Sequence, residues 1–420
     1  MSDNYETVRQ QVFSLCKKAK SASPSLASAS GQTRNGFLAA FADTLSSNET
    51  LILEANRADV EQAQDNGISL AMTDRLRLDS GRIAGICEGI RSLIGLSDPI
   101  GGGSVSVRPN GLEIKKISVP LGVVGTIFES RPNVAADIAA LCIKSGNCAV
   151  LRGGKEAANS NRAITDCARR ALAKAGLPED CISLIDFGGR DGATALMEAV
   201  GLVDVLIPRG GKGLIRSVTD KSKVPVIETG AGNCHIYVHS DADTDMAVKI
   251  AVNAKTQRPA VCNAAETFLV HKYAAEKFLP AVKEALKPSG TEIRGCGRTV
   301  SAIGCSQATE EDFATEYDDL IVSVKVVDSL DEAIEHINRY STAHSEAIIT
   351  SSISAAERFT SLVDSACVYV NASTRFTDGG EFGFGAEVGI STQKLHVRGP
   401  MGLSALTTCK YIINGNGQIR

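Results

Sequence analysis

The sequence lacks the long apolar run that a membrane-spanning helix needs. No uninterrupted stretch of its 420 residues reaches the required length of roughly 18 apolar residues. The amino-terminal segment MSDNYETVRQQVFSLCKKAK mixes charges throughout and lacks the apolar core of a signal peptide. We therefore expect a cytoplasmic protein without a membrane partner.

The sequence also lacks an excess of charge of either sign. Lys and Arg total 44 against 48 Asp and Glu, so the chain has no basic footprint for nucleic acid. Its hydrophobic content of 43% is that of a globular protein with two or three cores. A small-molecule ligand is the expected partner.

Metal-binding patterns are missing among the twelve cysteines, which include no Cys-x-x-Cys and no Cys/His cluster at ligand spacing. In a reducing compartment such cysteines are thiols, most of them small buried residues. We expect no bound metal and at most one or two reactive cysteines.

The G-x-G-x-x-G fingerprint of dinucleotide-binding proteins is missing too. The candidate replacement is the turn with Gly210, Gly211 and Lys212, which follows the apolar run DVLI and precedes the helical stretch LIRSVTDK. Glycines there let backbone N–H groups approach a pyrophosphate at a helix N-terminus. A Gly-rich strand-to-helix turn without a ligand is the alternative.

Several periodic stretches are present. Apolar residues at three- and four-residue spacing predict helices in NGFLAAFADTLSS and MTDRLRLDSGRIAGICEGIRSLIGL. Alternating side chains around Pro109-Asn110-Gly111 predict a β-hairpin. From Leu121 onward, short apolar runs such as GVVGTIF, CAVLR, CISLIDF, DVLIP and VPVIE alternate with helical stretches, which predicts a parallel sheet. A second α/β series begins near Gly230 with CHIYVH and continues through TFLVH, IVSVKVV, AIIT and CVYV.

A series of sequence blocks resembles the aldehyde dehydrogenase superfamily over essentially the whole chain. The blocks are PLGVVG at residues 120–125, Gly146-Asn147, Glu228-Thr229-Gly230 and Cys262. IFESRPNVAADIAALCIKSGN, LRGGKEAANSN, IPRGGKGLI, VIETGAGNCHIYV and HVRGPMGLSALTTCKYIINGNGQIR resemble one family within it, the gamma-glutamyl phosphate reductases.

The resemblance implies an α/β, aldehyde dehydrogenase-like fold. It implies a Rossmann-type cofactor domain at 1–104 and 121–229 and a second α/β domain, catalytic, at 230–400. The segments 105–120 and 401–420 resemble the superfamily's β oligomerisation arm, so a homo-oligomer is expected. An upstream glutamate kinase is a further candidate partner.

The implied activity is NADPH-dependent reduction of L-glutamyl 5-phosphate to L-glutamate 5-semialdehyde plus phosphate in proline biosynthesis, through a cysteine thioester. The resemblance assigns the nucleophile to Cys262 in TQRPAVCNAAETF, and Cys234 is the alternative. A free thiol has a pKa of about 8.5, so a reactive one needs polar surroundings that favour the thiolate.

Two further catalytic candidates follow from the resemblance. The superfamily's Pro-Trp-Asn block is replaced by ESRPN at residues 129–133, so the side-chain oxyanion donor is Asn133 or, aligned from the left, Arg131. Asn133 also fits the N-cap of the helix that follows. Glu228 matches the general base, although a phosphate-coupled reductase needs no hydrolytic water, and cofactor positioning or proton transfer is the alternative.

Charged residues complete the implied binding sites. Arg152 and Lys155 are candidates for the 2′-phosphate of NADPH, and Glu316 for the nicotinamide ribose. The acyl phosphate and α-carboxylate of the substrate need bidentate cations. The candidates for that role are Arg131, Arg258, Arg375 and Arg398.

The sequence allows two other functions. The first is an oxidising dehydrogenase of another small aldehyde, which the missing Pro-Trp-Asn block argues against. The second is a catalytically inactive scaffold on the same fold, which the intact Cys262 motif argues against.

Overall fold

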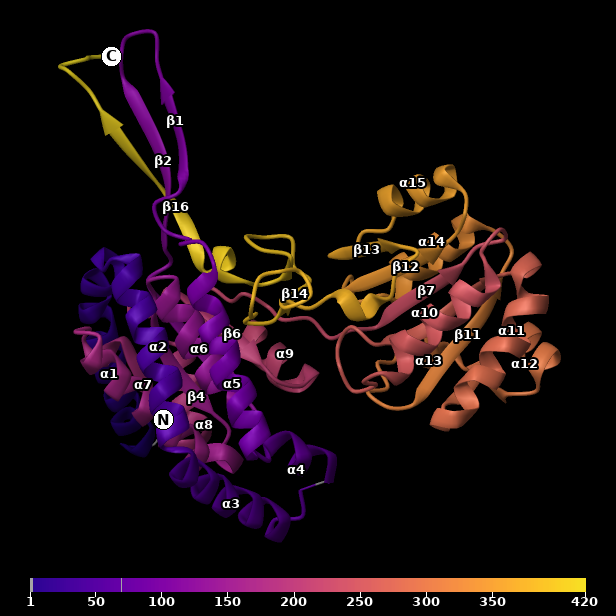
Figure 1. Ribbon diagram of the computed structural model, residues 1–420, viewed down its shortest axis with the longest axis horizontal. Helices are drawn as coiled ribbons and strands as arrows, with labels where there is room; N and C mark the ends of the chain where they lie inside the picture. Colours follow the sequence, from indigo (N-terminus) through magenta and orange to yellow (C-terminus); the bar gives the residue numbers. More distant parts are fainter. Residues whose placement is uncertain (1–2, 69) are drawn as a thin grey trace. The chain divides into compact units, whose positions relative to one another are not determined.

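The computed structural model describes residues 3–68 and 70–420, and the chain divides into two compact units (Figure 1). Unit 1 consists of Met1–Thr229, Gly383–Gly389 and Met401–Arg420. Unit 2 consists of Gly230–Phe382 and Ile390–Pro400.

A parallel four-stranded sheet in the order β5-β4-β3-β6 lies at the centre of unit 1. Its strands are β3 (Val123–Phe128), β4 (Cys148–Gly153), β5 (Ile182–Leu184) and β6 (Val205–Arg209). Every residue of β3 is buried, as in parallel sheets that are covered on both faces. The carboxyl ends of these strands share one edge, which is where open α/β sheets bind ligands.

The helices of unit 1 are α1 (Asp3–Ser28), α2 (Gly31–Ser47), α3 (Glu49–Asp65), α4 (Leu70–Leu76), α5 (Ser80–Ser92), α6 (Asn133–Lys144), α7 (Ala158–Lys174), α8 (Gly189–Met197) and α9 (Lys212–Lys221).

Two sequence expectations for unit 1 were wrong. The second predicted helix is interrupted between α4 and α5, because Asp79 leaves the helix to cap α5 and accepts a hydrogen bond from the Arg82 N–H at 2.7 Å. VPVIE forms an isolated bridge between Val226 and Leu206 and no strand. Pro225 has no N–H to extend a ladder.

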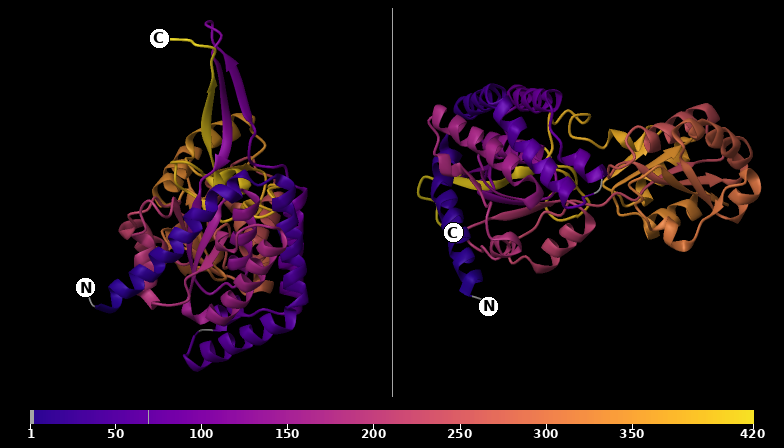
Figure 2. Two further views of the ribbon diagram at one scale, coloured as in Figure 1. Left: turned by 90° about the vertical axis from the view of Figure 1, so that its left-hand side faces the viewer. Right: turned by 90° about the horizontal axis from the view of Figure 1, so that it is seen from below.

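The predicted hairpin is confirmed and belongs to a three-stranded antiparallel sheet, here called the arm (Figures 1 and 2). It contains β1 (Gly103–Val107), β2 (Glu113–Pro120) and the C-terminal β16 (Thr407–Asn414). Gly111 has a φ of 83°, which the turn requires and which glycine adopts without strain.

A parallel seven-stranded sheet in the order β10-β9-β11-β8-β7-β12-β13 forms unit 2. The strands are β7 (Cys234–Val238), β8 (Ala265–His271), β9 (Glu292–Gly295), β10 (Ser306–Gln307), β11 (Ile321–Val327), β12 (Ser345–Ile349) and β13 (Cys367–Val370). The helices are α10 (Thr244–Thr256), α11 (Lys272–Leu286), α12 (Gly297–Ile303), α13 (Glu310–Phe313), α14 (Leu330–Tyr340) and α15 (Ile353–Leu362).

The Gly- and Arg-rich stretch after β13 has little regular structure. It contains the short strands β14 (Ile390–Ser391) and β15 (Gly399–Pro400) and the 3-10 helices η5 (Thr374–Phe376) and η6 (Leu403–Leu406). The α/β fold class expected from the sequence is confirmed in both units.

Truncation after Leu406 tests the arm. It removes β16, which pairs with β2 over its whole length from Thr407 to Asn414. We expect the truncated chain to aggregate, because β2 then presents an unpaired edge in a sheet that already exposes Val105 and Val107 on β1. The measurement is light scattering of the purified chain, with truncation after Asn414 as the matched control. Two equally monodisperse truncations would contradict this role for β16.

Candidate active site

Cys262 lies in the loop between α10 and β8, and its carbonyl packs against the segment that leads into β7. The Cys234 thiol donates a hydrogen bond to the Cys262 carbonyl oxygen at 3.2 Å. A Cβ on Gly232 would lie 1.4 Å from the same oxygen, so this position accepts no side chain. The Cys262 carbonyl therefore contacts both Cys234 and Gly232.

Cys262 and Cys234 differ in exposure. All twelve cysteines are thiols, Cys262 is half-buried and Cys234 is fully buried. Burial raises the pKa of Cys234 well above the ordinary value, and the charge of Glu346 raises it further. Because a buried, neutral thiol is a poor nucleophile, these surroundings disfavour Cys234, whereas Cys262 is accessible.

Arg375 brings a positive charge to the nucleophile loop. Its Nη1 donates to Oδ1 of Asn263, and its Nε donates to Oε1 of Gln257 at 3.0 Å. Burial lowers the pKa of Arg375, the neighbouring Arg258 lowers it too, and a Cys262 thiolate raises it. Arg375 is therefore close enough to Cys262 for the two groups to interact electrostatically.

The other candidates in unit 2 have different surroundings. Glu316 accepts a hydrogen bond from the Gly232 N–H at 2.6 Å. Gly232 is also the residue that lies against the Cys262 carbonyl. Arg258 is exposed. Arg398 donates from Nη1 to Oδ1 of Asp364 at 2.9 Å and from Nη2 to the Asp364 carbonyl at 2.8 Å.

In unit 1, the turn between β3 and α6 contains a strained residue that the sequence did not reveal. Ser130 has a φ of 45°, in the left-handed region, which costs a non-glycine residue on the order of 1 kcal/mol or more. Its N–H and its hydroxyl both donate to Oε1 of Glu156, each at 2.8 Å. These two bonds fix the direction in which the chain continues to Arg131.

Asn133 is the first residue of α6, and the N-cap is Pro132, which makes no side-chain cap. The alternative interpretation of Asn133 as the N-cap was therefore wrong. Its Nδ2 instead donates to Oδ2 of Asp137 one turn later, at 3.0 Å. Burial raises the pKa of Asp137 to about 6, against the opposing effects of Asn133 and Arg209. The i, i+4 spacing was the sequence signal for this pair.

The Gly-rich turn lies between β6 and α9, with Gly210, Gly211 and Lys212 exposed. The Gly211 N–H donates to a carboxylate oxygen of Glu129 at 3.1 Å. The Gly211 N–H at the N-terminus of α9 therefore binds a carboxylate oxygen. A phosphate oxygen would need a backbone donor of the same kind.

The remaining candidates lie near the same edge of the unit 1 sheet. Arg152 at the end of β4 donates to the carbonyls of Gly153 and Gly189, the latter at 2.6 Å, and burial lowers its pKa. Lys155 is exposed. Glu228 follows Ile227, whose N–H donates to the β6 carbonyl of Leu206 at 2.9 Å.

Over the part of the chain that the structure describes, no group of three or more His, Cys, Asp or Glu residues is placed to hold a metal ion. Within the same residues, no helix is long and apolar enough to span a membrane.

Comparison with known proteins gives one consistent family. Residues 3–291 and 314–412 match the aldehyde dehydrogenase family. The chain is 54% identical over 415 residues to gamma-glutamyl phosphate reductase of Clostridium novyi (strain NT), covering 98% of this chain and 100% of that one. The chain belongs to the gamma-glutamyl phosphate reductases of the aldehyde dehydrogenase family.

Solved structures agree with this membership. The crystal structure of gamma-glutamyl phosphate reductase from Thermotoga maritima is 47% identical, with a TM-score of 0.95 over 97% of this chain and 99% of that one. An engineered glycolyl-CoA reductase with bound NADP+ shares the fold at 16% identity, with a TM-score of 0.68 over 96% of each chain.

Thiol labelling tests the contrast between the two cysteines. At pH 7 we expect iodoacetamide to alkylate Cys262 before Cys234, because the raised pKa of Cys234 keeps it a neutral, buried thiol. Mass spectrometry of the native protein after short exposures distinguishes the two peptides, and the buried Cys142 is the internal control. Earlier alkylation of Cys234 would refute the assignment.

Proposed function

We propose that this chain reduces L-glutamyl 5-phosphate to L-glutamate 5-semialdehyde and phosphate, with NADPH as reductant, in the cytoplasm as a step of proline biosynthesis. The observation that carries the proposal is the half-buried Cys262, with which Arg375 interacts, in a chain that is 54% identical over 415 residues to a gamma-glutamyl phosphate reductase.

The covalent chemistry belongs to Cys262. Its thiolate attacks the acyl carbon, the bond from that carbon to the phosphate oxygen breaks, and inorganic phosphate leaves with the electron pair. A thioester remains on Cys262. After hydride addition to this carbon, the thiohemiacetal collapses, the carbon–sulfur bond breaks, and the aldehyde and the thiolate are released.

Oxyanions form during thioester formation and again during reduction, and each needs hydrogen-bond donors. The Cys262 N–H is one candidate, with the side chain of Asn133 or Arg131 as the second. Asn133 already donates to Asp137, so its amide orientation is fixed by a partner on the same helix. Glu228 is proposed to position the cofactor or to transfer a proton, and water activation is not needed.

The residues of unit 1 fit NADPH. The Gly211 N–H already binds an anionic oxygen, so Gly210, Gly211 and Lys212 are proposed to hold the pyrophosphate. When bound, NADPH supplies the hydride. Lys155 is proposed as the principal cation for the 2′-phosphate, because Arg152 is engaged with two carbonyls. Glu316 is proposed to contact the nicotinamide ribose.

The substrate's two anionic ends need cations. Arg375 is proposed to face the acyl phosphate because it interacts with Cys262. Arg131 and Arg258 are proposed for the α-carboxylate, and Arg398, paired with Asp364, remains the weakest candidate.

Assembly is proposed as well. The exposed apolar side chains of the arm, including Tyr411 and Ile413, support a homo-oligomer that covers them. Light scattering of the full chain at a monomer's mass would contradict this.

Contact with glutamate kinase is proposed from the instability of acyl phosphates. An unchanged product yield when the two enzymes are separated by a dialysis membrane would contradict it.

A coupled assay with glutamate, ATP, glutamate kinase and NADPH tests the function. We expect semialdehyde formation from the wild type and loss of at least about 1000-fold in Cys262→Ala, because the covalent step has no substitute. Cys142→Ala, which removes a buried cysteine remote from the proposed chemistry, is the matched control. Retained activity in Cys262→Ala would move the nucleophile elsewhere. Phosphate-independent oxidation of the aldehyde would favour the oxidising dehydrogenase.

Cofactor preference is tested separately by Lys155→Glu. Reversing this exposed charge should weaken NADPH binding about tenfold or more while NADH binding changes little, because only NADPH carries the 2′-phosphate. Titration by nucleotide fluorescence measures both, and Lys174→Glu is the control. Equal losses for both nucleotides would show that Lys155 does not read the 2′-phosphate.

A further inference from the structure

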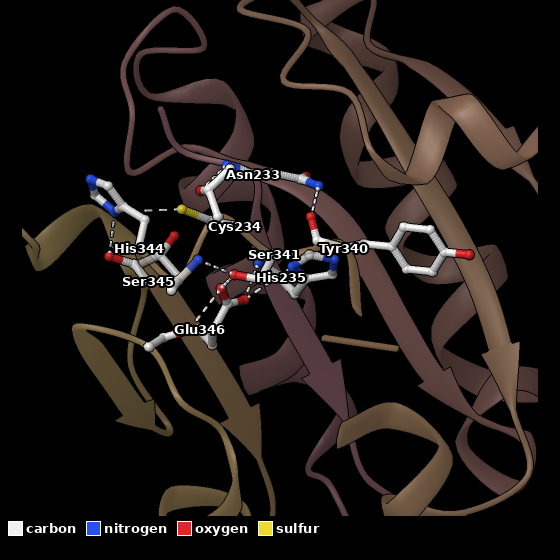
Figure 3. A network of polar contacts seen from close by, with 12 residues as sticks. Asn233, Cys234, His235, Tyr340, Ser341, His344, Ser345 and Glu346 are labelled. Carbon is white, nitrogen blue, oxygen red and sulfur yellow. Dashed lines mark hydrogen bonds and ion pairs between the residues drawn. The ribbon is translucent and has the colours of Figure 1, made fainter. Parts of the chain in front are cut away.

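A ring of polar contacts, completed by the covalent chain at Thr377 and between Cys262 and Asn263, runs through the interior of unit 2 and begins and ends on the nucleophile segment. Figure 3 shows the Cys234 thiol beside His344, with Ser345 adjacent. The thiol donates to the Cys262 carbonyl at 3.2 Å and its sulfur lies 3.8 Å from Nδ1 of His344. The same Nδ1 lies 2.8 Å from the Ser345 hydroxyl.

The ring then returns to the residue after the nucleophile. The hydroxyl of Ser345 lies 2.7 Å from that of Thr377, and Nδ2 of Asn263 donates to the Thr377 carbonyl at 2.8 Å. The Thr374 hydroxyl adds a hydrogen bond to this ring, which it donates to the Asn263 carbonyl at 2.7 Å. Every residue of the ring other than Cys262 is buried, so water competes little for these bonds.

His235 and Glu346 form a buried pair next to the ring. The backbone N–H of His235 donates to Oε2 of Glu346 at 2.7 Å, and Nδ1 of His235 lies 3.1 Å from the same oxygen (Figure 3). His235 follows Cys234 on β7, and Glu346 follows Ser345 on β12. The pair therefore holds the two ring residues at a fixed separation across paired strands.

We propose that Cys234 is a positioning residue, whose thiol holds the Cys262 carbonyl and thereby aims the nucleophile. Hydrogen bonds to the carbonyls of both Cys262 and Asn263 fix two consecutive peptide groups and so the direction of the Cys262 side chain. The side chain of Asn263 also holds Arg375, so the same ring places the cation that interacts with the thiolate. This inference rests on the proposed role of Cys262.

The chemistry of the thiol suits this role. Burial keeps Cys234 protonated at neutral pH, so it stays a donor and does not compete for the substrate. A cysteine that merely fills the core would need no acceptor, whereas this one points its sulfur at the carbonyl of the nucleophile.

The test compares Cys234→Ala, Cys234→Ser and a control, Cys167→Ala, which removes an equally buried thiol from α7 of unit 1. The reverse reaction, with semialdehyde, phosphate and NADP+, measures kcat and KM. We expect kcat to fall about 10- to 100-fold in Cys234→Ala with KM within about twofold, because a misaimed nucleophile affects the chemical step. Serine, which retains a donor, should restore most of kcat. Cys167→Ala should lower the thermal midpoint without changing kcat.

Alkylation gives a readout that needs no substrate. Lys255 and Lys272 bound a segment in which Cys262 is the one cysteine, so its modification by iodoacetamide is followed by mass spectrometry. We expect the pH midpoint of Cys262 alkylation to rise in Cys234→Ala and to return toward wild type in Cys234→Ser. Wild-type kcat and an unchanged midpoint in folded Cys234→Ala would overturn the inference. An inactive wild type with the expected alkylation shifts would instead refute the proposed function alone.

Discussion

The approach of the Cys262 carbonyl to Gly232 is the constraint on which the candidate active site of unit 2 depends. No side chain fits at position 232, because a Cβ would overlap the carbonyl oxygen. The same glycine donates its N–H to Glu316, and Cys234 two residues later donates its thiol to the Cys262 carbonyl. One short segment at the start of β7 therefore contacts both the nucleophile candidate and a proposed cofactor ligand.

The fold was predictable where the apolar pattern is strong. CHIYVH and IVSVKVV became β7 and β11, and the turn at Pro109 to Gly111 joined two strands as the alternation predicted. The failures came from local hydrogen-bonding groups. Asp79 capped a new helix three residues after α4 had ended at Leu76, and the proline in VPVIE removed a donor that a strand needs. Short elements such as β9 and α12 went unrecognised because their sequences are too short for periodicity.

The candidate site was predictable only in part, because motifs name residues and leave their partners unspecified. Cys262 and the Gly-rich turn follow from sequence blocks. The left-handed backbone of Ser130 and its bonds to Glu156 join residues 26 positions apart and have no sequence pattern. The link from Asn263 to Thr377 spans 114 positions. Glu129 accepts the hydrogen bond of the Gly211 N–H, but in the sequence block ESRPN only Arg131 and Asn133 were predicted to have a role.

The order of the units along the chain has a consequence for synthesis on the ribosome. Unit 2 is nearly continuous, from Gly230 to Phe382 with the short return Ile390–Pro400, whereas unit 1 is assembled from both ends of the chain. Of the two strands that pair with β2 in the arm, β16 is separated from it by almost 300 residues along the chain. Domains fold as their segments emerge, at about 5–20 residues per second. The whole sequence of unit 2 is therefore translated before β16, and the nascent chain carries the arm with one edge of β2 unpaired until residues 407–414 are added.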